Sequence, residues 1–122
     1  PRGYLIASRV ISITNNEDGT LSALGQIIAH VTLDYAYIAL YLDRYNPVTE
    51  DWENISYQVA EFTLEEEGEA FMGFPMVSYE LSGEDIIPGY YYRLRGTYSA
   101  SKSGRKETSN AATDGVLLTK VK

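Results

Sequence analysis

The chain is 122 residues long, carries a net charge of −7 at neutral pH and contains no cysteine. This length is enough for one self-sufficient core, so we expect a single domain over residues 1–122. The lack of cysteine excludes disulfides and thiolate metal sites. The acidic balance argues against nucleic acid as a partner, because phosphate binding needs clustered cations. No apolar run approaches the roughly 20 residues of a transmembrane helix, so we expect no transmembrane segment.

Short apolar runs between turn signals predict β-strands in the first half of the chain. The expected strands are Tyr4–Thr14, Thr20–Val31, Tyr37–Tyr45 and Trp52–Thr63. The third reads as the clearest central strand, with one aliphatic and one polar-aromatic face. In the fourth, Ile55, Tyr57 and Val59 are expected to share a face, because they lie at alternate positions.

Glycine and proline residues interrupt two of the expected strands. Gly25 interrupts the second strand, which predicts a bulge or a close approach of another segment. Leu64–Ala70 is acidic and reads as a single helical turn or a loop. Phe71–Leu81 is the next expected strand. Pro75 cannot donate a ladder hydrogen bond, so that strand is expected at a sheet edge or with a bulge.

A β-hairpin is predicted over Tyr90–Thr113, with a polar loop at Ser99–Lys106. Alternation gives its first strand one apolar-aromatic face and one cationic face. The aromatic face holds Tyr90, Tyr92, Leu94 and Gly96, and the cationic face holds Tyr91, Arg93, Arg95 and Thr97. Val116–Leu118 is expected to complete the last strand. These strands, about seven in all with turns between them and no amphipathic helix, predict an all-β fold, an antiparallel β-sandwich.

The hairpin resembles the last hairpin of fibronectin type III domains. The matching residues are Tyr90, Tyr92, Arg93, Leu94, Gly96, Ser103-Gly104 and Ser109-Asn110. The resemblance implies an immunoglobulin/fibronectin-III-like sandwich. It also implies that Tyr90 is the tyrosine-corner residue, whose hydroxyl bonds back to the preceding connection. The whole chain is also similar to small secreted proteins of Gram-positive bacteria that have no assigned function. That similarity implies a secreted or cell-surface protein. Residue 1 is proline rather than methionine, so we expect a processed N-terminus from which a signal peptide has been removed.

Residues that could carry chemistry are few. His30 is the only histidine, and no Gly-x-Ser-x-Gly elbow, dinucleotide or phosphate-loop glycine pattern is present. We therefore expect no catalytic residues and no cofactor. Glu65–Glu69, or Asp43 with Glu50, Asp51 and Glu53, offers the oxygen ligands that calcium prefers, but no known metal-site spacing is met. Solvated charge is the favoured interpretation of these acidic residues, and no metal is expected.

The best candidate ligand-binding residues are aromatic side chains expected to point outward. They are Tyr41, Tyr45, Trp52, Tyr57, Tyr91 and Tyr98. Such rings can stack on sugar faces or anchor a protein partner at low entropic cost. For each one taken alone, packing against neighbouring strands is the simpler interpretation.

The sequence therefore favours a non-enzymatic extracellular or cell-surface interaction module that binds an unknown protein or glycan. A carbohydrate-binding module using Trp52 and the tyrosines is the alternative, and a small hydrolase built on paired carboxylates is a weaker one. These alternatives differ in what they require. Sugar binding needs a flat, coplanar row of exposed rings, whereas hydrolysis needs two carboxylates facing each other in a pocket. The oligomeric state stays open, including a homodimer through the edge strand near Pro75.

Overall fold

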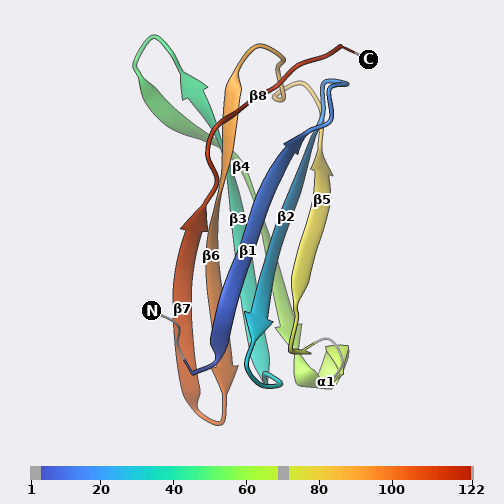
Figure 1. Cartoon of the computed structure of the whole chain (residues 1–122), viewed down its shortest axis with the longest axis vertical. Coiled ribbons are helices and arrows are strands. Elements are labelled where there is room, and N and C mark those ends of the chain that lie inside the picture. Colours follow the sequence, from blue (N-terminus) through green and yellow to red (C-terminus); the bar gives the residue numbers. More distant parts are fainter. Residues whose placement is uncertain (1–3, 69–71, 122) are drawn as a thin grey trace.

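The computed structural model describes residues 4–68 and 72–121, and these residues form two antiparallel β-sheets and one helical turn (Figure 1). The elements in chain order are β1 (Ile6–Asn15), β2 (Leu21–Ala29), β3 (Tyr35–Asn46), β4 (Asp51–Thr63), α1 (Leu64–Glu67), β5 (Met76–Leu81), β6 (Tyr91–Lys102), β7 (Arg105–Ala112) and β8 (Val116–Leu117). No helix within the described part of the chain is long and apolar enough to cross a membrane.

The sheets have the orders β1-β2-β5 and β4-β3-β6-β7, with β8 paired to β6 beyond the end of β7. They lie face to face along the long axis of the molecule (Figure 1). The expected antiparallel β-sandwich is confirmed, with the short β8 as an additional strand. The strand expected over Tyr37–Tyr45 is central, since β3 lies between β4 and β6.

The core lies between the sheets, because alternate side chains of the inner strands point toward the opposite sheet. Ile38, Leu40 and Leu42 of β3 are fully buried, as are Leu21 and Ile27 of β2. The buried residues form two clusters along the sandwich. Each cluster contains residues of both sheets, so the apolar interior joins one sheet to the other.

The connection before β6 contains a tyrosine corner, at a different residue from the expected one. The hydroxyl oxygen of Tyr92 accepts a hydrogen bond from the Ile87 backbone N–H at 2.8 Å and lies 3.3 Å from the Asp85 carbonyl oxygen, to which it donates. Tyr92 is fully buried. The assignment to Tyr90 is therefore wrong. Tyr90 is 37% exposed, and the Arg44 guanidinium lies 5.1 Å from the centre of its ring.

Three expected boundaries also change. The strand expected over Phe71–Leu81 begins only at Met76, after Pro75; Phe71 lies outside the described residues. Its placement at a sheet edge is confirmed. The loop expected over Ser99–Lys106 is a two-residue turn, because Ser103 and Gly104 both adopt positive φ, at 51° and 82°. Leu64–Glu67 takes the helical-turn alternative, capped by the Thr63 hydroxyl; Glu69 and Ala70 are not described.

Candidate functional site: the outer face of the five-stranded sheet

A β-bulge in β4 decides which aromatic residues share a surface. Leu42 pairs with Ser56, and the next β3 residue, Asp43, pairs with Asn54, so Ile55 has no direct partner. An extra residue reverses the alternation of side chains beyond it. Trp52 and Tyr57 are five residues apart and would face opposite sides of a regular strand. The bulge places both on the outer face, opposite Tyr45 and Tyr41.

The same bulge corrects one expectation. Ile55 does not share a face with Tyr57 and Val59, because its side chain packs against the core cluster around Leu42 and Tyr92. Tyr57 and Val59 are exposed, at 67% and 43%. The Asn54 amide nitrogen lies 3.1 Å from the Leu42 carbonyl oxygen, so it bonds to a backbone group beside the bulge.

Asp43 is the centre of this outer face. Asp43 is only 2% exposed, although its side chain points away from the core, between two arginines of β6. Arg93 Nε lies 3.0 Å from Oδ2, and Arg95 Nε lies 2.5 Å from the same oxygen. Arg95 Nη2 donates to Oδ1 at 3.1 Å, and Asn54 reaches Oδ1 at 3.3 Å. A buried carboxylate is stabilised only by such multiple hydrogen bonds.

These contacts set the charge state of Asp43. Burial alone raises the pKa of a carboxyl group, because it disfavours the charged form. Hydrogen bonds from Arg95, Arg93 and Asn54 favour the carboxylate and outweigh this effect, so the pKa of Asp43 is lowered. The carboxylate therefore stays ionised and holds both guanidinium groups in fixed positions.

The arginines in turn order the aromatic rings. The Arg93 guanidinium lies 4.6 Å from the centre of the Trp52 ring, and that of Arg95 lies 5.1 Å from the Tyr41 ring. Beyond them, Tyr45 meets Trp52 edge-on with ring centres 5.4 Å apart. The result is a continuous layer of cations and rings, worth about 0.5–2 kcal/mol for each cation–π pair. We call it the aromatic–arginine face; it comprises Tyr41, Asp43, Tyr45, Trp52, Tyr57, Tyr91, Arg93 and Arg95.

Five of the six candidate binding residues lie on this face. Tyr91 lies near Trp52, because both rings are close to Gly115. A Cβ atom on that glycine would lie 3.1 Å from the Trp52 ring and 3.9 Å from the Tyr91 ring. Tyr91 is 50% exposed. A hollow of about 390 Å³ lies beside Tyr41 and Arg95, over β6 and β7. The structure therefore brings together residues that are spread over three strands.

The outward placement of Tyr98 is wrong. Tyr98 is fully buried between the sheets, and its hydroxyl donates to the Val10 carbonyl oxygen at 2.8 Å. Burial raises its pKa to about 12. Alternation along β6 from the buried Tyr92 and Leu94 would have placed it inward. It is part of the core and is not available to a ligand.

Sequence reasoning did not identify Asp43, Arg93 and Arg95 as parts of the candidate site. Alternation placed all three on the outer face, but it could not show that they meet across β3 and β6. The sequence offers Asp43 as a calcium ligand beside Glu50, Asp51 and Glu53, whereas in the structure its carboxylate binds arginine. Within the described residues, no group of three or more His, Cys, Asp or Glu side chains is placed to hold a metal ion.

No protein-family model matches this sequence, and no curated protein is significantly similar to it.

Proposed function

We propose that the protein is a non-enzymatic interaction module of an extracellular or cell-surface protein, related to fibronectin type III domains, and that its aromatic–arginine face binds a protein partner. The tyrosine corner at Tyr92 supports the relationship, because such a corner at the start of this strand is characteristic of immunoglobulin-like sandwiches. A bacterial origin belongs to the same proposal and rests on the likeness to small secreted Gram-positive proteins.

The observation that carries the binding proposal is the fixed order of rings around Asp43. Aromatic and arginine side chains dominate binding energies at protein interfaces, particularly where little conformational freedom is lost on binding. Here salt bridges and cation–π contacts already restrict the arginines and their rings. Tyr57 and Tyr91 provide exposed ring area on the same face.

The geometry gives less support to sugar binding. The Tyr41 and Tyr57 rings are inclined at 33° to each other, and the Tyr45 and Trp52 rings at 65°. They do not form the coplanar row that stacking on a sugar chain would use. Arg93 also covers part of the Trp52 ring, the main residue of that alternative. A protein surface can fit such an uneven, partly cationic face more readily.

The test is binding of the labelled protein to intact cells and to panels of purified surface proteins and polysaccharides. We expect saturable binding to a protein target that falls about tenfold or more when Tyr57→Ala and Tyr91→Ala are combined. Tyr4→Ala is the matched control, because Tyr4 is 75% exposed and stacks on Arg105, away from this face. Binding that polysaccharide alone inhibits, with Trp52 emission protected from acrylamide, would favour the carbohydrate alternative. Equal losses in the control and the double variant would reject this face as the site.

A further inference from the structure

The two long sides of the sandwich differ in how they are closed. On the β1–β7 side, the Glu107 carboxylate accepts hydrogen bonds from the backbone N–H groups of Tyr4, Leu5 and Ile6 at 2.7–3.0 Å. Arg9 of β1 also donates to the Ser109 hydroxyl of β7 at 2.7 Å. These bonds tie the edges of the two sheets together across the gap. The two sheets are therefore joined directly on that side, at the start of β1.

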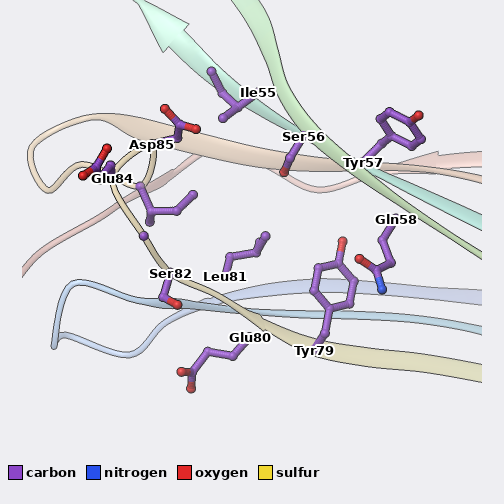
Figure 2. A pocket seen from close by; sticks show the side chains of 12 residues that line it. Ile55, Ser56, Tyr57, Gln58, Tyr79, Glu80, Leu81, Ser82, Glu84 and Asp85 are labelled. Carbon is purple, nitrogen blue, oxygen red and sulfur yellow. The ribbon is translucent and has the colours of Figure 1, made fainter.

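The opposite side, between β4 and β5, is open. A groove of about 530 Å³ lies there, lined by residues 55–58 of β4, 79–81 of β5 and the following loop through Ile86. Figure 2 shows Tyr79 and Leu81 pointing from β5 toward β4, on which Ile55 lies. Ile55, Leu81 and the buried Ile86 pack on the same core cluster, so the floor of the groove is apolar.

β5 presents an unpaired edge to this groove. The Ile27 N–H donates to the Pro75 carbonyl oxygen at 3.0 Å, which makes this a hydrogen-bonded pair of the β2–β5 ladder. Because such pairs alternate in antiparallel sheets, Met76, Ser78 and Glu80 direct their backbone groups away from β2. Among the described strands, none pairs with β5 on that side. The edge can therefore accept one more strand.

The charge of the groove indicates what kind of strand could add to the β5 edge. The residues that line the groove, 55–58 and 79–86, include three acidic residues, Glu80, Glu84 and Asp85, and no Lys, Arg or His. Glu80 points away from the interior, onto the outer face of the three-stranded sheet (Figure 2). Glu84 and Asp85 are exposed in the lining loop, and no ion pair involves these three carboxylates in the described part of the chain. Arg44, the nearby cation, donates to the Asp85 carbonyl oxygen at 3.2 Å.

From these features we propose that the β4–β5 groove binds an extended segment of a partner protein in which apolar and basic residues alternate. The segment adds to the β5 edge as a fourth strand of that sheet. Its apolar side chains enter the groove beside Leu81, and its Lys or Arg side chains lie on the outer face beside Glu80. Edge addition uses the main chain for affinity and alternate side chains for specificity. A second copy of this chain is disfavoured, because pairing two such acidic edges would oppose like charges.

Tyr57 is the one residue of the groove lining that also belongs to the aromatic–arginine face, and the groove is tested on its own. The probe is a fluorescein-labelled Lys-Val-Lys-Val-Lys-Val peptide, followed by fluorescence anisotropy with the unmodified protein. Two control peptides separate the contributions. Glu-Val-Glu-Val-Glu-Val reverses the charge, and a Lys-Val peptide methylated on alternate backbone nitrogens keeps the charge but cannot complete the ladder. We expect saturable binding of the first peptide only.

Variants then locate the site. Ser78→Pro removes an edge N–H that β2 does not use, and proline is tolerated at such edges. We expect it to weaken binding about tenfold or more. Glu80→Gln with Glu84→Gln and Asp85→Asn should weaken binding by a similar factor and reduce its salt dependence. Glu65→Gln, Glu66→Gln and Glu67→Gln in α1 remove the same charge elsewhere and should change the dissociation constant less than about twofold.

Several results would overturn the proposal. These are no binding at about 1 mM peptide, equal binding of the methylated peptide, or an equal loss in the α1 variant. The last two would mean that only charge attracts the peptide. If Ser78→Pro fails to fold, as judged by its thermal unfolding, the methylated peptide still decides the matter with the unaltered protein. Tyr91→Ala, at a residue of the aromatic–arginine face that does not line the groove, should leave this binding unchanged, which separates it from the proposed function.

Discussion

Gly25 of β2 lies so close to Leu40 of β3 that a Cβ atom on the glycine would stand 2.8 Å from Leu40 Cδ2 and 3.1 Å from Cδ1. The two residues belong to opposite sheets, and Leu40 is fully buried. The pairing of β2 with both neighbours is regular at Gly25. Of the bulge and the close approach expected from the sequence, the close approach is therefore the one observed. The glycine sets how near the sheets lie at this point of the core.

Gly25→Ala is expected to lower the free energy of unfolding by about 1–3 kcal/mol, since overpacking forces buried neighbours to shift. Urea denaturation followed by Trp52 fluorescence measures this loss. Gly73→Ala is the matched control, because its added Cβ would meet nothing within 4 Å. A loss of equal size in both variants would show that glycine flexibility, and not the contact with Leu40, causes the effect.

The tyrosine corner allows a direct comparison of two neighbouring tyrosines. Tyr92→Phe leaves the Ile87 N–H without its 2.8 Å partner in a partly buried site, which we expect to cost about 1–3 kcal/mol of stability. Tyr90→Phe keeps the ring that Arg44 contacts and should change stability by less than about 0.5 kcal/mol. Thermal unfolding of both variants measures the difference. A larger loss of stability in Tyr90→Phe than in Tyr92→Phe would contradict the assignment of the corner to Tyr92.

Alternation of side chains predicted much of this fold. It correctly gave β3 as a central strand with Ile38, Leu40 and Leu42 inward, and proline chemistry correctly placed β5 at an edge. It could not choose between Tyr90 and Tyr92, because residues two apart share a face. Only the hydrogen bond to Ile87 distinguishes them.

The candidate site was less accessible to sequence reasoning, for two physical reasons. The bulge at Ile55 is one extra residue with no glycine to signal it, yet it decides that Trp52 and Tyr57 lie on the same face. The salt bridges at the centre of the face join Asp43 to Arg93 and Arg95, which are 50 and 52 residues away along the chain. Contacts between residues far apart in the sequence leave no local pattern.

The salt bridges of Asp43 predict how stability depends on pH. A carboxyl group whose pKa is lowered by folding contributes stability above its unfolded pKa of about 4, and loses that contribution as the pH falls through its folded pKa. Glu107 acts in the same direction. Desolvation raises its pKa, but bonds from the Ile6, Leu5 and Tyr4 N–H groups outweigh this and lower it. We therefore expect the free energy of unfolding to decrease as the pH is lowered from about 4.

Asp43→Asn tests the central contact of the aromatic–arginine face. The amide cannot balance Arg93 and Arg95, so we expect a loss of about 2–4 kcal/mol at pH 7 and a smaller loss on acidification than in the unmodified protein. Urea titrations from pH 7 to pH 3 measure both quantities. Asp51→Asn is the control, since Asp51 is an exposed acid on the same sheet. Full stability of Asp43→Asn at pH 7, or an acid profile like that of the unmodified protein, would contradict this role. Since Arg93 stacks on Trp52, a supporting result should also include a change in Trp52 emission, linking the loss of the carboxylate to movement of the face.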